Sequence, residues 1–216
     1  MIDVTQQINA VDRKVGTRTL EAGEARVVTI GRTYDAPVDD VWDAVTNPER
    51  LPRWFLPVSG DLRLHGRYQF EGNAGGTIER CDPPKSLAAT WEYGGEVSWI
   101  EVRLAPVAEG GTRLELEHTA HVDDEFWLQY GPGATGVGWD LGLLGLDLHL
   151  SGGSVDPIEL TAWDASDEAG QFKALSSERW RDASIAAGTD PAQAQAAADR
   201  TTGFYTGTAP DEPPAS

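Results

Sequence analysis

The chain has 216 residues, 40% of them hydrophobic, which suits one globular domain with additions. Its 35 acidic and 17 basic residues give a formal net charge of −18, which would repel a phosphate backbone or an anionic membrane surface. The sequence therefore predicts no nucleic-acid partner and no membrane insertion.

The single cysteine and the apolar segments narrow the class of protein further. Cys81 alone excludes an internal disulfide and a thiolate zinc site, and we interpret it as a small buried side chain. The N-terminus lacks the apolar core of a signal peptide, and the longest apolar stretch is short and contains Asp147 and His149. We expect a cytoplasmic protein.

Residues 1–25 are predicted to form an N-terminal extension made of a short helix and a strand. Val4, Ile8 and Val11 recur at i, i+4 and i+7, which is typical of an amphipathic helix. Residues 17–34 are rich in β-branched side chains and predict extended chain.

Two short helices joined at a kink are predicted over residues 37–55. Pro37 suits the first position of a helix, where a proline costs no hydrogen bond. Asn47 is expected to cap a second helix, which Pro52 bends or ends. The acidic residues of the first helix lie off its apolar stripe and indicate a solvated face. That stripe consists of Val38, Val41, Trp42 and Val45.

Between residues 60 and 122 the hydrophobic period changes to two, which indicates strands. Short glycine-rich gaps separate the alternating segments and predict an antiparallel meander with one apolar face. The first segment, residues 61–70, places four apolar side chains on one face: Leu62, Leu64, Tyr68 and Phe70.

A long helix is predicted over residues 135–150, where apolar side chains recur at helical spacing, and it is long enough to cover the apolar face of the sheet. Residues 151–206 predict accessory helices, the last of them capped by Asp190. Residues 207–216 predict a disordered tail.

Three segments carry a resemblance to a known family: "TYDAPVDDVWDAVTNPERLPRWF", "GGTIERCDPPKSLAATWEY" and "GVGWDLGLLGLDLHL". With the order of elements, they make residues 26–150 similar to the helix-grip superfamily (START or SRPBCC), and within it to bacterial relatives of the activator of heat-shock-protein-90 ATPase. The resemblance implies an α+β fold, in which a curved antiparallel sheet wraps around a long C-terminal helix and encloses an apolar cavity. Nothing here resembles the separate chaperone-docking domain of the eukaryotic activator.

The segment "GPGATG", residues 131–136, satisfies the dinucleotide pattern G-x-G-x-x-G. A nucleotide loop must follow a parallel strand and lead back to another strand, whereas here hairpin-joined strands precede the motif and helices follow it. We therefore interpret the glycines as a flexible connection into the terminal helix. A lid through which a ligand enters is the functional alternative.

His118 shares the inward face of its strand with Leu114 and Leu116, so it would look into the cavity. The favoured interpretation is a core histidine bonded to a neighbour, and the alternative is a ligand-orienting or proton-transfer group. No motif of covalent catalysis occurs, and neither a metal nor a cofactor is predicted. The remaining histidines have no metal-ligand spacing with His118: His65, His121 and His149.

Aromatic side chains are expected to line the cavity, with Trp54 and Phe55 closing one of its ends. The predicted ligand-binding set is Trp54, Phe55, Tyr68, Phe70, Trp91, Tyr93, His118, Trp127, Tyr130, Trp139 and Leu143.

Three functions are compatible with this sequence. The first is binding of a small apolar or aromatic molecule without catalysis, which is favoured by the expected cavity and the lack of a catalytic set. The second is a cyclase-like or dehydratase-like enzyme, with His118 as acid or base and Tyr68 or Tyr93 placing a carbonyl. The third is an interaction protein, such as a chaperone partner, that binds through its acidic surface. Fold analogy does not choose among them, and a homodimer stays open.

Overall fold

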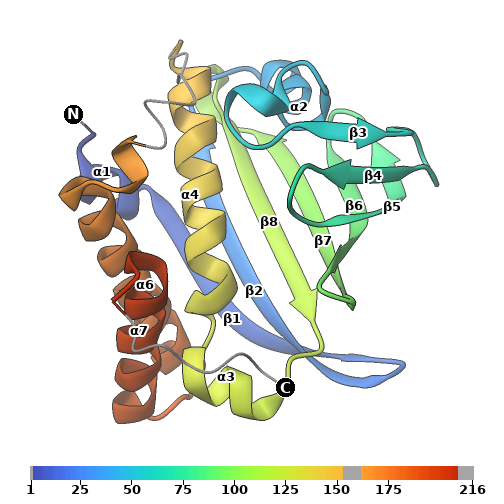
Figure 1. The fold of residues 1–216 in the computed structure, drawn as a ribbon. Coiled ribbons are helices and arrows are strands. Elements are labelled where there is room, and N and C mark those ends of the chain that lie inside the picture. The colour runs from blue at the N-terminus through green and yellow to red at the C-terminus, as the bar shows by residue number, and fades with distance from the viewer. Residues whose placement is uncertain (1, 153–161, 209–216) are drawn as a thin grey trace.

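The computed structural model describes residues 2–152 and 162–208, which form an α+β fold (Figure 1). Their strands make one curved antiparallel sheet in the order β1-β2-β8-β7-β6-β5-β4-β3. The long helix α4 crosses one face of the sheet, and α6 packs against both α4 and the edge strand β1 (Figure 1). The predicted helix-grip architecture is confirmed.

The strands are β1 (Val11–Leu20), β2 (Gly23–Tyr34), β3 (Val58–Gly60), β4 (Arg67–Phe70), β5 (Gly75–Asp82), β6 (Ser86–Tyr93), β7 (Glu96–Pro106) and β8 (Thr112–Ala120). The helices are α1 (Val4–Asn9), α2 (Val38–Thr46), α3 (Asp124–Tyr130), α4 (Gly133–Leu150), α6 (Asp167–Ala186) and α7 (Pro191–Thr206), with short 3₁₀ turns η1 (Leu51–Arg53) and η2 (Ala108–Gly110).

The predicted N-terminal helix and strand are both present, and the strand belongs to the main sheet. β1 pairs with β2 along its whole length. α1 buries Val4 and Ile8 in a cluster with Leu144 of α4 and Phe172 of α6. The N-terminal extension therefore supplies an edge of the sheet and packs against the accessory helices.

The second of the two predicted short helices is only the 3₁₀ turn η1. Pro52 lies within this turn and has no N–H with which to continue a helix. Asn47 is the C-cap residue of α2, and its side-chain oxygen accepts a hydrogen bond from the Glu49 N–H. The chain thus turns sharply after α2 and presents Trp54 from the turn that follows.

Residues 61–66 leave the sheet, although their alternating pattern predicted a strand. His65 has a φ of 65°, and a Cβ at Gly66 would lie 1.9 Å from the Asp61 carbonyl oxygen. These two residues therefore adopt turn conformations that a continuous strand cannot hold. Only Arg67–Phe70 remain as β4.

The interpretation of residues 131–136 as a flexible connection or a lid is wrong. Gly131 ends α3, a helix that the sequence analysis did not anticipate, and Gly133 already begins α4. A Cβ at Gly136 would lie 2.2 Å from Cε2 of Trp180. These glycines therefore let α4 approach its neighbouring helices closely.

The accessory helices follow the prediction, and the Asp190 side chain caps α7 by accepting two backbone N–H groups. The start of the accessory segment, residues 153–161, lies outside the described residues, as do residues 209–216 of the predicted tail. Within the described ranges no helix is long and apolar enough to cross a membrane.

A buried ion pair joins α4 to the elements on either side of it. The Arg13 guanidinium of β1 donates to both carboxylate oxygens of Asp140, at 2.6 and 3.0 Å. Ser176 Oγ and Trp180 Nε1 of α6 donate to the same carboxylate, at 2.6 and 2.9 Å. Side-chain exposure is 3% for Arg13 and 0% for Asp140, so this pair is isolated from water.

Removing one partner of the Arg13–Asp140 pair should leave the other charge buried and unpaired. Asp140→Ala is expected to lower the free energy of unfolding by about 3–5 kcal/mol, because Arg13 is left buried and unpaired. Asp12→Ala, in strand β1 beside Arg13, removes only a surface ion pair with Arg113. It should lower the free energy of unfolding by less than about 1 kcal/mol. Urea unfolding of both variants measures the difference, and equal losses would contradict the role given to Asp140.

Two glycines in helices provide a matched test of packing. Gly136→Ala should destabilise the protein by about 1–3 kcal/mol, because the new methyl group meets the Trp180 ring. Gly170→Ala in α6 meets nothing within 4 Å and should stabilise it by about 0.5–1 kcal/mol. Thermal melting should therefore shift in opposite directions, and a shift in the same direction would contradict close packing at Gly136.

Candidate ligand-binding cavity

A cavity of about 350 Å³ lies between the sheet, α4 and the corner formed by α2 and η1. Strands β4 to β8 contribute one wall, and Leu143 and Leu146 of α4 contribute the opposite one. Its lining is mostly apolar, because the inward residues of each strand alternate with polar residues on the other face. The space is where the sequence analysis placed a cavity.

Most of the predicted ligand-binding residues lie around this space. Their rings form a continuous wall: Phe55 and Phe70 have centroids 5.0 Å apart, Phe70 and Trp91 5.9 Å, and Trp91 and Trp139 5.0 Å. Trp54 extends the wall beyond Phe55 at 5.6 Å. The predicted residues in the lining are Trp54, Phe55, Tyr68, Phe70, Trp91, Trp139 and Leu143.

Four predicted residues are not in the lining, and three of them lie away from the cavity. Tyr93 is 62% exposed, at the end of β6 where the strand enters its turn. Trp127 and Tyr130 belong to α3, and they line a small gap between α3, α6 and α7. The sequence analysis assigned no element to residues 123–130, so it had no helix with which to orient these two side chains.

Other lining residues were not singled out from the sequence. Trp42 and Val45 reach the cavity from α2, and their place in its apolar stripe was the available signal. Cys81 also belongs to the lining, but it is exposed, so the interpretation of a buried cysteine is wrong. It lies in β5 just before the turn at Pro83, where the sheet ends.

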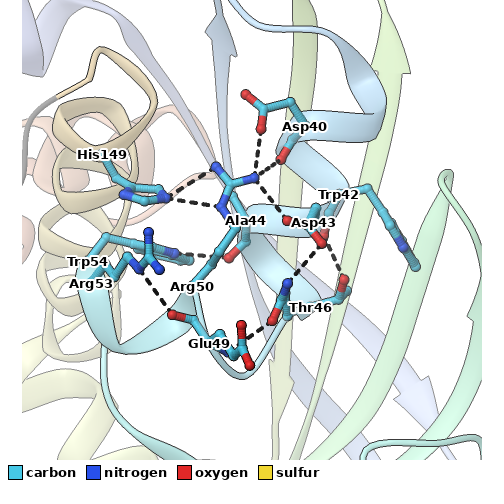
Figure 2. A network of polar contacts seen from close by, with 11 residues as sticks. Asp40, Trp42, Asp43, Ala44, Thr46, Glu49, Arg50, Arg53, Trp54 and His149 are labelled. Atoms are coloured by element: carbon cyan, nitrogen blue, oxygen red, sulfur yellow. Dashed lines mark hydrogen bonds and ion pairs between the residues drawn. The ribbon is translucent and has the colours of Figure 1, made fainter.

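A polar cluster holds the α2–η1 corner against the C-terminal end of α4 (Figure 2). The Arg50 guanidinium donates to Asp40 Oδ1 at 2.6 Å and to Asp43 Oδ2 at 3.0 Å. Its Nε lies 3.2 Å from His149 Nε2 of α4. Two of the acidic residues expected on a solvated face are therefore partners of Arg50.

The same corner fixes one end of the cavity. Trp54 Nε1 donates to the carbonyl oxygen of Ala44 in α2 at 3.0 Å (Figure 2). Partial burial, with the positive charge of Arg50, lowers the pKa of His149, which favours the neutral imidazole as an acceptor for the guanidinium. Trp54 is thus held in the lining by its bond to α2, while Arg50 ties the same corner to the long helix.

His118 does not line the cavity but lies behind Trp139. Trp139 Nε1 donates to His118 Nδ1 at 3.0 Å, and His118 Nε2 lies 2.8 Å from Ser98 Oγ. Ser98 Oγ in turn donates to the Trp91 carbonyl oxygen at 3.0 Å. These bonds assign the proton of the neutral imidazole to Nε2, and they connect the two tryptophans that meet in the cavity wall.

Comparison with known families places these observations in context. Residues 35–150 match the family described as "Activator of Hsp90 ATPase homolog 1-like protein". The chain belongs to this family. The described residues of the cavity lining fall within the matched range. No curated protein matches the sequence significantly.

Solved structures similar to this family member have the same fold. The crystal structure of CalU16 from Micromonospora echinospora is 37% identical, with a TM-score of 0.64 over 81% of this chain and 98% of that one. Its solution NMR structure gives 38% identity and a TM-score of 0.67 over 82% and 97%. The protein EF2215 from Enterococcus faecalis, a conserved protein of unknown function, is 17% identical, with a TM-score of 0.56 over 79% and 92%.

No group of three or more histidine, cysteine, aspartate or glutamate residues in the described part of this Hsp90-activator-like chain could hold a metal ion. Burial lowers the pKa of His118, which lies behind the cavity wall, from 6.5 to about 4. It is therefore neutral at pH 7 and able to keep its bond from Trp139.

The lowered pKa of His118 makes the stability of this protein depend on pH. Because the folded pKa lies below the ordinary 6.5, the unfolded chain takes up this proton first. The contribution of the neutral imidazole to stability is fully present above pH 6.5 and is lost as the pH falls towards 4. NMR titration of the native protein should show no protonation of His118 between pH 8 and about 5.5, while the urea-unfolded chain titrates near 6.5. A titration midpoint near 6.5 for His118 in the native protein would contradict its burial between Trp139 and Ser98.

Proposed function

We propose that this protein binds a small hydrophobic or aromatic molecule in the cavity between the sheet and α4, without catalysis. The proposal is supported by a cavity whose volume of about 350 Å³ falls within the range of known ligand sites, roughly 300–1,000 Å³. Membership of a family with this fold supports it at the level of architecture.

The observation that carries the proposal is an aromatic wall around unfilled space. Protein interiors are normally packed with few voids larger than a water molecule. Here the rings from Trp54 to Trp139 pack edge to face or tilted against each other and border a space of about 350 Å³. A flat apolar ligand would supply the missing contacts.

The position of His118 supports binding over acid–base catalysis. Both of its ring nitrogens are occupied by Trp139 and Ser98, and the imidazole is absent from the lining. A proton-transfer group needs a ring nitrogen within reach of the substrate. We therefore assign His118 to holding Trp139 in place.

A substitution that fills the cavity tests the proposal. Gly142 of α4 belongs to the lining, and a Cβ there would lie 3.9 Å from Phe55, which is ordinary contact. Gly142→Leu should therefore keep the helix and occupy the space. Fluorescence titration with the neutral dye N-phenyl-1-naphthylamine is expected to give saturable binding to the wild type, weakened at least about tenfold in the variant, a loss of about 1.4 kcal/mol.

Gly170→Leu is the matched control, since it makes the same change in α6, where a Cβ meets nothing within 4 Å. It should leave dye binding unchanged. Equal affinity in the wild type and Gly142→Leu would place the dye outside the cavity. Native mass spectrometry of gently purified protein complements the titration, because a released stoichiometric apolar compound would identify the natural ligand.

A further inference from the structure

The hydrogen-bond donors of the cavity lining differ in whether they already have an acceptor within the protein. Several lining donors are satisfied internally and are therefore not available to a ligand without breaking a bond. Tyr68 Oη donates to the Thr90 carbonyl oxygen at 2.6 Å, Trp54 Nε1 to the Ala44 carbonyl oxygen at 3.0 Å, and Trp139 Nε1 to His118 Nδ1 at 3.0 Å.

The indole N–H groups of Trp42 and Trp91 are different, because neither has an acceptor among residues 2–152 and 162–208. Their nitrogen atoms are also not fully buried. The buried side-chain polar atoms without a partner in the described ranges are Arg32 Nε and His121 Nε2, and neither tryptophan is among them. Both indole donors are thus accessible groups on residues that line the cavity.

The two tryptophans reach the space from different elements. Trp42 belongs to α2 and points away from the Arg50 cluster (Figure 2). Trp91 belongs to β6, between Phe70 and Trp139 in the aromatic wall. A flat molecule lying on this wall would bring its edge to an indole N–H, which donates but cannot accept.

Among the described residues, Arg63 is the one charged member of the lining. Its side chain is 80% exposed and paired with Asp61 at 2.7 Å. It therefore belongs to the mouth of the cavity. Burial of an unpaired ligand charge among apolar side chains would be costly. A neutral ligand avoids this cost.

We propose that the cavity takes a neutral aromatic molecule that carries a carbonyl or ether oxygen, which accepts a hydrogen bond from the indole N–H of Trp91 or Trp42. This inference rests on the ligand-binding function proposed above and specifies its ligand class. The aromatic wall provides affinity for the ring system, and the two free donors select for the oxygen.

Three probes of nearly equal shape separate these contributions: fluorene, which has no acceptor, 9-fluorenone, which replaces its methylene by a carbonyl, and fluorene-9-carboxylate, which adds a negative charge. Isothermal titration of the wild type with each probe is expected to give 9-fluorenone an affinity about five- to tenfold above that of fluorene, as one neutral hydrogen bond implies. The carboxylate should bind more weakly than both.

Substitution by phenylalanine keeps a ring and removes the indole donor. Trp91→Phe combined with Trp42→Phe should bind 9-fluorenone and fluorene equally, and the single variants should show which donor the carbonyl uses. Trp99→Phe is the control, since Trp99 lies outside this lining, in β7 beside His121. It should retain the preference of the wild type.

The outcomes separate this inference from the function on which it rests. Equal affinities for fluorene and 9-fluorenone in the wild type would overturn the donor-based selection while leaving apolar binding in place. Tightest binding of the carboxylate would overturn the neutral ligand class. Failure of all three probes to bind would instead count against the cavity as a ligand site. A preference for 9-fluorenone that survives the double substitution would show that another group selects the oxygen.

Discussion

The buried ion pair between Arg13 and Asp140 determines how the long helix lies on the sheet. A carboxylate with no exposure to water must be held by full hydrogen bonding, and here β1 and α6 supply four donors to it. Because the Asp140 side chain must face these partners, the rotation of α4 about its axis is set. A helix advances about 100° per residue, so the rest of its faces follow from this one contact.

That rotation directs the cavity side of α4. Trp139, Leu143 and Leu146 lie one residue before, three after and six after Asp140, which places them together on a neighbouring face of the helix. The same face carries Gly142, which leaves volume unfilled beside Phe55. The Arg13–Asp140 pair holds the N-terminal strand and the accessory helix to α4. It thereby also orients the α4 side chains that line the cavity.

The corner around Arg50 completes the site from the other end. Its bonds to α2 and to His149 hold η1 against α4, and Trp54 follows from this turn. A Cβ at Gly145 would lie 2.5 Å from the Trp54 carbonyl oxygen, so glycine is required for the close approach. The cavity is therefore bounded by two polar anchors outside its apolar lining, and its interior keeps few groups that can form hydrogen bonds.

The sequence by itself determined most of the order of elements and the inward faces of the strands, because hydrophobic periods of two and 3.6 are local patterns. The helix-grip fold followed from the resemblance of three segments to a known family. The sequence did not determine where residues 131–136 or α3 lie, so Trp127 and Tyr130 were assigned to the wrong neighbourhood. Only the tertiary structure decided that His118 stands behind Trp139 and that the Trp42 and Trp91 indoles find no acceptor in the described part of the chain. Hydrogen-bond partners are contributed by residues far apart in the chain, and no local pattern encodes which donors remain free.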